Sequence, residues 1–285
     1  MKQVLITGSN GQLGSEIRVA SPLFPQFRFF FTDVQELDIC DKDAVSAFVT
    51  ENKIEAIVNC AAYTAVDKAE DDSETCYKIN RDAVEILAEV AREFKLQIIH
   101  VSTDYVFDGK SYLPYSEEMA VSPSTVYGKS KLDGETVLTE ICPDAVIVRT
   151  SWLYSSFGNN FVKTMLRLGR EKENLTVIFD QIGTPTYAAD LAEAILSILA
   201  FDNPQPGIYH YSNEGVCSWY DFTRSIHRFA GITCNLTPIE SKEYPVRTPR
   251  PHFSVLNKAK IKQTFGIAIP HWEDSLEKCI RLLIS

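Results

Sequence analysis

Three observations predict an α/β fold, built on a doubly wound parallel sheet with a smaller C-terminal lobe. The chain has 285 residues, enough for a full α/β domain and a second lobe. Short apolar runs alternate with amphipathic stretches through its first half, which is typical of a parallel sheet covered by helices. A glycine-rich turn follows the first apolar run directly and opens the first amphipathic stretch.

The alternation predicts each element in order. We expect strands at about 2–7, 27–33, 54–60, 96–102 and 145–151, and helices at about 11–20, 41–52, 73–94 and 124–141. Beyond residue 150 the rhythm loosens, with further strands expected at 175–179 and 207–211 and helices at about 187–201 and 271–284. The proline-bearing segment 244–251 is expected to be neither helix nor central strand.

Composition excludes several classes of partner. The formal net charge is −10 and no basic run is present, which argues against nucleic-acid binding. A strand follows Met1 at once, and no run of 18 apolar residues occurs, so we expect neither a signal peptide nor a membrane span. The seven cysteines are scattered without a CxxC pair, as in a cytoplasmic protein that uses them as small core residues.

The glycine-rich turn predicts dinucleotide binding and therefore a Rossmann-type sheet. Gly8, Gly11 and Gly14 are spaced so that backbone N–H groups at a helix N-terminus can meet a pyrophosphate. Asp33 lies 19 residues after Gly14, at the end of the second strand, where a carboxylate can bind the ribose hydroxyls. That carboxylate favours NADH over NADPH unless a nearby cation offsets it, and no arginine follows Asp33 directly.

The same pattern predicts how the chain divides. The dinucleotide-binding domain is expected to take residues 1–151 plus about 180–211. The second lobe, expected to bind the substrate, is assigned about 152–179 plus 212–285.

A tyrosine and a lysine supply the chemistry. Tyr127 and Lys131 are four residues apart and share one face of a predicted helix. A free phenol titrates near 10, and an ammonium about 4 Å away at an effective dielectric of about 20 contributes up to roughly 4 kcal/mol, or about 3 pK units. We therefore expect Lys131 to lower the pKa of Tyr127 and to bind the nicotinamide ribose. Thr103, at a strand end, can hold a carbonyl oxygen for hydride transfer.

Longer strings resemble the extended short-chain dehydrogenase/reductase superfamily and, within it, the dTDP-4-dehydrorhamnose reductase family. They include residues 61–70, 102–109, 126–131, 149–154 and 250–256, so the resemblance runs essentially end to end. It implies NADPH- or NADH-dependent reduction of the 4-keto group of a dTDP-sugar, dTDP-4-dehydrorhamnose, to give dTDP-L-rhamnose.

The resemblance also implies residue roles. Tyr127 would donate the proton, with Lys131 as its partner and Thr103 at the carbonyl. Thr103, Asp104 and Trp152 would contact the sugar, although Trp152 could equally be a core residue. Arg250 would bind the diphosphate, the alternative being a surface arginine in a proline-rich loop. The residues expected around the cofactor are Gly11, Gln12, Leu13, Asp33, Asp38, Ile39, Ala61, Ala62 and Tyr63.

A bridging metal is left open by the sequence. Some members of the family bind Mg²⁺ between two subunits through glutamates, which gives a homodimer. Glu16 and Glu273 are candidates here. Where a third acid is expected, near residue 186, the chain has Tyr187-Ala188-Ala189 and only then Asp190. No cluster of histidines and cysteines offers a different metal site.

Two alternatives compete with the reductase. A 4,6-dehydratase needs an acid and a base after the threonine, but here Asp104 is followed by Tyr105, and an epimerase would keep its cofactor bound through turnover. A non-catalytic regulatory subunit would retain the fold without the chemistry. The intact set of Thr103, Tyr127 and Lys131 argues against that subunit.

Overall fold

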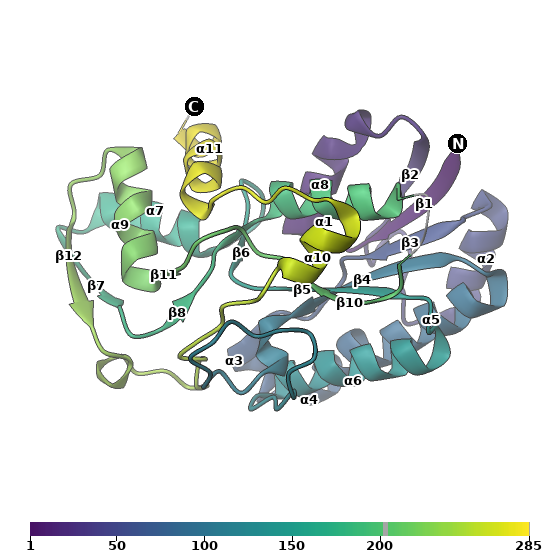
Figure 1. Cartoon of the computed structure of the whole chain (residues 1–285), viewed down its shortest axis with the longest axis horizontal. Helices are drawn as coiled ribbons and strands as arrows, with labels where there is room; N and C mark the ends of the chain where they lie inside the picture. Colours follow the sequence, from purple (N-terminus) through teal and green to yellow (C-terminus); the bar gives the residue numbers. More distant parts are fainter. Residues whose placement is uncertain (202–204, 285) are drawn as a thin grey trace.

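A parallel sheet forms the centre of the molecule. The computed structural model describes residues 1–201 and 205–284. Its six-stranded sheet has the order β10-β5-β4-β3-β1-β2, as Figure 1 shows. The strands are β1 (Lys2–Thr7), β2 (Phe27–Phe31), β3 (Ala56–Asn59), β4 (Gln97–Thr103), β5 (Val146–Thr150) and β10 (Gly207–His210). Each lies within a predicted strand or close to it, so the predicted α/β class and doubly wound sheet are confirmed.

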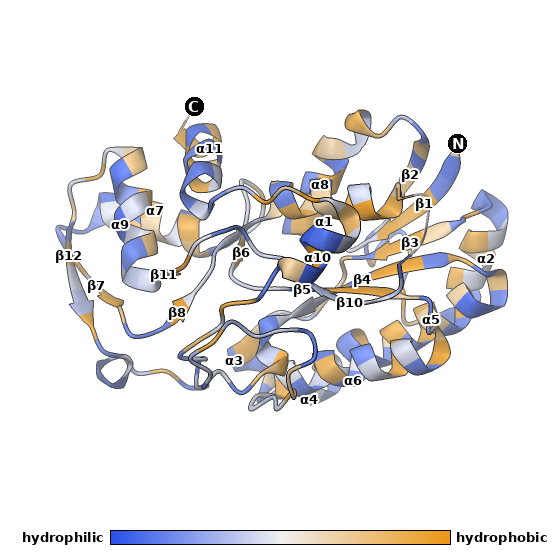
Figure 2. Cartoon of the chain, viewed as in Figure 1, coloured by the Kyte–Doolittle hydropathy of each residue, from blue (hydrophilic) through white to orange (hydrophobic). Residues whose placement is uncertain are grey.

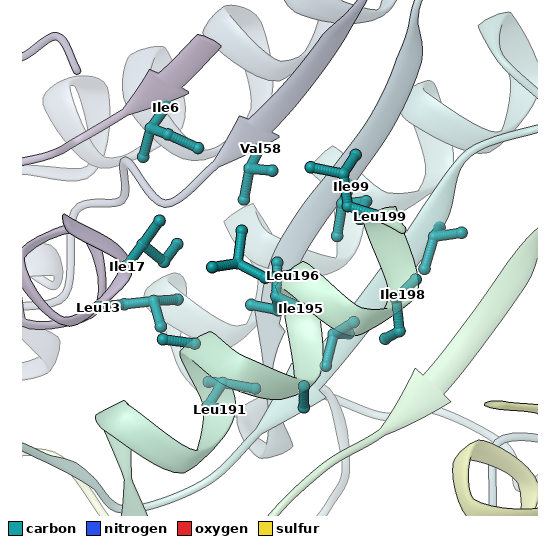
Figure 3. Close-up of a cluster of buried hydrophobic side chains, with 14 of the residues drawn as sticks. Ile6, Leu13, Ile17, Val58, Ile99, Leu191, Ile195, Leu196, Ile198 and Leu199 are labelled. Carbon is teal, nitrogen blue, oxygen red and sulfur yellow. The ribbon is translucent and has the colours of Figure 1, made fainter. Parts of the chain in front are cut away.

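Helices cover both faces of this sheet because its strands are apolar on both sides. One face carries α1 (Gln12–Ala20) and α8 (Ala188–Leu199), and the other carries α2 (Lys42–Asn52), α5 (Ala83–Phe94) and α6 (Val126–Ile141). Figure 2 shows hydrophobic strands between helices of mixed character. Figure 3 shows the first face, where strand side chains meet those of α1 and α8: Ile6, Val58, Ile99, Leu13, Ile17, Leu191, Ile195 and Leu196. Each such buried side chain contributes about 1.5–3 kcal/mol.

The helix predicted at 73–94 is interrupted by a π-helical turn. The structure has α4 (Ser73–Tyr77), a π-helical turn η2 (Lys78–Asp82) and then α5. In this turn the side-chain oxygen of Asn80 accepts from the backbone N–H of Tyr63 at 2.9 Å, and its nitrogen donates to Ser130 Oγ at 3.0 Å. A π-turn widens the helix locally, and here it directs a buried amide toward α6. Apolar periodicity could not reveal it.

The C-terminal half builds a second hydrophobic cluster. Its helices are α7 (Phe161–Glu171), α9 (Trp219–Ala230) and α11 (Trp272–Ile284), and its strands β7 (Asn174–Ile178) and β12 (Asn235–Ile239) pair in parallel. The cluster includes Tyr154, Phe222 and Leu276. Helices α7 and α9 were not predicted, whereas α11 and β7 were. The predicted lobe boundaries stay a prediction, and residues 202–204 and 285, which fall inside those ranges, lie outside the described residues.

Short elements join these units. They are η1 (Ser21–Leu23), α3 (Val66–Ala69), η3 (Asp104–Val106), β6 (Leu153–Tyr154), β8 (Ile182–Gly183), β9 (Thr186–Tyr187), β11 (Cys217–Ser218), η4 (Ser241–Glu243) and α10 (Ala259–Phe265). The segment 244–251 is irregular, as predicted. Among the helices in the described part of the chain, none is long and apolar enough to cross a membrane.

Helix α6 is held against the sheet by a buried ion pair and against the π-turn η2 by a close backbone contact. Glu135 accepts from Arg149 of β5 through Nε at 2.9 Å and Nη2 at 2.6 Å, and both side chains are only 3% exposed. Arg149 lies opposite Ser102 in the β4–β5 register. Gly134 brings the helix so close to the π-turn that a Cβ there would lie 2.1 Å from the carbonyl oxygen of Asn80.

Replacing Gly134 by alanine should therefore destabilise the protein, although alanine is the better helix former. The new methyl group forces α6 away from η2, and we expect a loss of about 1–3 kcal/mol in the free energy of unfolding. Urea denaturation followed by circular dichroism measures this. Lys129→Ala, at an exposed position of the same helix, is the control and should change little. Equal stability of G134A and the unchanged protein would contradict the described contact.

Candidate active site

The carboxyl ends of four strands meet at one cleft. Strand β1 lies between β2 and β3, so the chain changes direction across the sheet at this point. Open α/β sheets bind ligands at such switch points. A cavity of about 350 Å³ opens here, lined by the glycine-rich loop, the ends of β4 and β5, and α6.

The glycine-rich loop presents backbone amides to this cleft. Gly8 follows β1 with φ of +61°, a conformation that other residues rarely adopt, and a Cβ there would lie 2.6 Å from the Cα of Ala61. Helix α1 then starts at Gln12, with Gly11 as an N-cap that supplies no side-chain hydrogen bond. The N–H groups of the first turn therefore need an outside acceptor, and a pyrophosphate suits them.

Asp33 braces the loop at the end of β2. Its Oδ2 accepts from the backbone N–H of Asn10 at 3.0 Å, and its Oδ1 accepts from the N–H of Val34 at 2.9 Å. Each carboxylate oxygen has lone pairs beyond these bonds. The geometry fits a carboxylate that shapes the loop and can also accept from ribose hydroxyls.

A cation that the sequence reasoning missed lies beside the same loop. Arg18 of α1 donates from Nη2 to Ser9 Oγ at 3.2 Å, and its guanidinium carbon lies 4.3 Å from the centre of the Phe31 ring. Ser9 immediately precedes Asn10, which donates to Asp33. The sequence has no arginine directly after Asp33, and Arg18 comes instead from the first helix.

The other predicted cofactor residues divide into two groups. Those that line the cleft are Gly8, Gly11, Gln12, Leu13, Ala62 and Lys131. Gly14 is buried in the first turn of α1, and Ile39 places its side chain in the core shared with α2. Asp38 is exposed and accepts from Cys40 N–H at 2.9 Å, while the backbone N–H of Ala61 donates to Asn59 at 3.1 Å. The backbone N–H of Tyr63 donates to the side-chain oxygen of Asn80 at 2.9 Å.

Tyr127 and Lys131 enter the cleft from α6. The hydroxyl of Thr125 caps the helix by accepting from Gly128 N–H at 3.0 Å. Lys131 is 2% exposed and donates from Nζ to Val101 O at 2.7 Å, with His100 Nε2 at 3.2 Å. Burial lowers the pKa of Lys131 to about 8.

The expected lowering of the Tyr127 pKa by Lys131 is not what the structure shows. Burial raises the pKa of Tyr127 above its usual range, the nearby carboxyl of Asp104 raises it further, and a hydrogen bond with Thr103 offsets part of this. The ammonium of Lys131 is directed to Val101 and His100 instead of the phenol. Spacing on one helix face brought the two residues together, but acceptors on β4 decided where the lysine points.

Thr103 and Asp104 stand side by side at the end of β4. The hydroxyl of Thr103 hydrogen-bonds Asp104 Oδ1 at 3.1 Å and accepts from the N–H of Tyr105 at 3.2 Å. Asp104 is 4% exposed, and burial raises the pKa of its carboxyl to about 7. Both residues line the cleft with Tyr127, so the structure brings the predicted catalytic set together.

A larger cavity of about 700 Å³ shares Asp104, Tyr105 and Trp152 with the first. Trp152 has φ of +47°, and its ring stacks on that of Trp219 at 3.5 Å between centroids. The tryptophan therefore lines both cavities and is not only a core residue. Trp219 begins α9, which was not predicted; Ser218 and Gly231 at the two ends of an amphipathic run were the available signals.

Arg250 also lines the larger cavity. Its Nη2 donates to Asp67 of α3 at 2.7 Å, and its Nη1 is buried without a hydrogen-bond partner in the described part of the chain. Arg247, nearby in the same cavity, pairs with Asp71. A guanidinium with an unused donor fits a phosphate ligand.

The acids considered for Mg²⁺ are engaged separately. Glu16 is buried and accepts from Ser155 Oγ at 2.6 Å, Asp190 accepts from Asn213 at 2.6 Å, and Glu273 is in an ion pair with an arginine of α9. Within residues 1–201 and 205–284, no three His, Cys, Asp or Glu side chains gather closely enough to hold a metal ion. These residues do not fit a metal within one chain.

Comparison with known proteins agrees with this geometry. The family model described as RmlD substrate binding domain matches residues 1–284. A dTDP-4-dehydrorhamnose reductase of Aggregatibacter actinomycetemcomitans is 40% identical over 97% of this chain and 98% of its own. A crystal structure of a dTDP-4-dehydrorhamnose reductase from Clostridium acetobutylicum has a TM-score of 0.95 at 43% identity, covering 99% of this chain and all of that one. The corresponding Bacillus anthracis reductase, in complex with NADP, has a TM-score of 0.93 at 38% identity, with 99% of each chain covered. The chain therefore belongs to the RmlD substrate-binding-domain family.

Proposed function

We propose that the chain reduces the 4-keto group of dTDP-4-dehydrorhamnose to give dTDP-L-rhamnose. The observation that carries the proposal is one cleft in which Thr103, Tyr127 and Lys131 face the glycine-rich loop. The relatives named as dTDP-4-dehydrorhamnose reductases match this chain over nearly its full length. The cleft adjoins a larger cavity with two arginines, which suits the anionic part of a nucleotide sugar.

The residues of the cleft divide the work of carbonyl reduction. A bound reduced nicotinamide supplies the hydride. Tyr127 holds the proton that goes to the keto oxygen, because a phenol is protonated at neutral pH and burial raises its pKa further. Thr103 orients that oxygen, and Lys131, which lines the same cleft, would bind the ribose of the cofactor. Trp152 and Trp219 form an apolar wall where the cleft meets the larger cavity, which helps to exclude water.

The substrate diphosphate is assigned to Arg250. Its buried Nη1 has no hydrogen-bond partner among the described residues, and its ion pair with Asp67 leaves the guanidinium at the cavity wall. A bidentate phosphate contact would satisfy that donor. The hydrophobic clusters on the two faces of the sheet are distinct from the one around α7, α9 and α11, which supports the proposed division into a cofactor domain and a substrate lobe.

The cofactor is NADH or NADPH, and Arg18 favours NADPH. The Bacillus anthracis neighbour was solved with NADP. In this chain the carboxylate of Asp33 would repel a 2′-phosphate. The guanidinium of Arg18 donates to Ser9, whose neighbour Asn10 donates to Asp33, so its positive charge can offset that repulsion.

Arg18→Ala should therefore weaken NADPH binding about tenfold while leaving NADH binding nearly unchanged, since a hydrogen bond to a charged group is worth about 1.5–3 kcal/mol. Titration of the reduced-nicotinamide fluorescence gives both dissociation constants. Arg28→Ala is the matched control, because Arg28 of β2 also stacks on a phenylalanine but lies at the other end of the strand. An equal loss for NADH and NADPH would contradict the role of Arg18.

Tyr127→Phe should lower turnover by at least about 10²-fold, because it removes the proton donor and keeps the ring. Affinity for NADPH should stay near that of the unchanged protein. Tyr105→Phe is the control: its ring lies 5.4 Å from that of Tyr127, and no proton is assigned to it. Near-normal turnover of Y127F would contradict the assignment of Tyr127.

The proposed function is tested by loss of reduced-nicotinamide absorbance with enzymatically prepared dTDP-4-dehydrorhamnose. Rapid oxidation of NADPH or NADH that depends on this sugar is the expected result. Folded protein that binds the cofactor and oxidises neither form would favour a regulatory subunit or another nucleotide sugar. An epimerase would instead be purified with nicotinamide already bound.

A further inference from the structure

The direction of one hydrogen bond decides whether Thr103 can act on a carbonyl. A threonine hydroxyl has one hydrogen to donate and two lone pairs to accept. The N–H of Tyr105 fills one lone pair, at 3.2 Å. Asp104 Oδ1 lies 3.1 Å from Thr103 Oγ1 and accepts from it when the carboxylate is ionised. Protonation of Asp104 allows this bond to reverse.

An ionised Asp104 would disable Thr103 as a donor. A carboxylate only accepts, so the single hydrogen of Thr103 would go to Oδ1 and would not reach a substrate oxygen. A protonated Asp104 reverses the bond. Its O–H then donates to Thr103 Oγ1, the N–H of Tyr105 and this O–H fill both lone pairs, and the threonine hydrogen is directed toward the cleft, where Thr103 also hydrogen-bonds the hydroxyl of Tyr127.

The surroundings of Asp104 favour the protonated form. The carboxyl is 4% exposed, and its Oδ2 has no hydrogen-bond partner in the part of the chain that the structure describes. An isolated buried carboxylate is costly, so such a group keeps its proton. Consistent with this, burial raises the pKa of Asp104 to about 7.

The charged groups that line the same two cavities as Asp104 are bound to other residues. On the side of the larger cavity, Arg250 is paired with Asp67 of α3 through Nη2 and keeps Nη1 without a partner among the described residues, and Arg247 is paired with Asp71. On the side of α6, the ammonium of Lys131 is bound to Val101 O.

The other titratable groups near Asp104 are the phenols of Tyr105 and Tyr127. Burial raises the pKa of both above their usual range. Both therefore stay neutral in the range where Asp104 titrates, and neither supplies a positive charge.

We propose that Asp104 is a positioning residue that, in its protonated form, donates to Thr103 Oγ1, which turns the threonine hydrogen toward the keto oxygen of the substrate. The proposal rests on the proposed reductase function and deepens it. Asp104 keeps its proton throughout: the proton that reaches the keto oxygen comes from Tyr127, and the hydride comes from the nicotinamide.

Protonation of Asp104 should make kcat/KM depend on pH. Because the native state raises the pKa of this acid, the protonated form is present below about pH 7 and is lost as the pH rises. The kcat/KM should therefore fall above that pH. Lys131, whose pKa burial lowers to about 8, faces the same cleft and contributes its own loss at higher pH.

The decisive comparison is the pH profile of kcat/KM for Asp104→Asn and Asp104→Leu. An asparagine amide donates to Thr103 at every pH, so the kcat/KM of D104N should stay within about tenfold of that of the unchanged enzyme at low pH. The decrease in kcat/KM near pH 7 should disappear in D104N. The decrease at higher pH that is assigned to Lys131 should remain. D104L offers no donor and should lose at least about 10²-fold. In a Thr103→Val background the D104N change should no longer move the profile. NADPH binding and circular dichroism establish that each variant is folded.

A second readout does not depend on turnover. The infrared difference spectrum between the unchanged protein and D104N should contain the carbonyl stretch of a protonated carboxylic acid at about pH 6 and lose it about two units higher. Absence of that band at low pH, or a D104N profile that keeps the limb near pH 7, would overturn the proposal while turnover of the unchanged enzyme upholds the function. No turnover by the unchanged enzyme would overturn both.

Discussion

The buried ion pair between Glu135 and Arg149 is the constraint on which the active site depends. It joins α6 to β5 beside Ser102, one residue before Thr103. Removing one partner of such a pair costs about 3–5 kcal/mol, because the other charge is left buried. Tyr127, Lys131 and Glu135 follow one another at intervals of four on one helix face. Fixing the glutamate therefore also fixes the tyrosine and the lysine against the end of β4.

Burial then sets the character of the site. It raises the pKa of Tyr127 and Asp104 and lowers that of Lys131, so each group moves toward its uncharged form. Each of these shifts favours a neutral hydrogen-bonding group over a charged one. Preorganised donors of this kind are effective in a site that excludes water. We propose that the anionic ligands are bound by the glycine-rich loop, Arg18 and Arg250.

The sequence predicted the sheet and most of its helices, and the three residues proposed for catalysis lie in one cleft, because apolar periodicity and motif spacing are local properties. It missed features that depend on contacts between distant segments. The π-turn around Asn80 packs on α6, and Arg18 reaches the cofactor loop from the following helix. The spacing of Tyr127 and Lys131 indicated their shared helix face but not that Lys131 bonds Val101. The acids considered for Mg²⁺ each have hydrogen-bond partners of their own, which spacing could not indicate.

In the proposed reaction a hydride reaches C4 of the sugar while Tyr127 protonates the oxygen. The most direct test uses a reduced nicotinamide carrying deuterium at C4, on either face in turn, and identifies the sugar product by NMR. Deuterium from one face of the nicotinamide should be found only at C4 of dTDP-L-rhamnose. The Y127F variant should form this product far more slowly. Deuterium at another carbon, or a product without deuterium from either face, would contradict it.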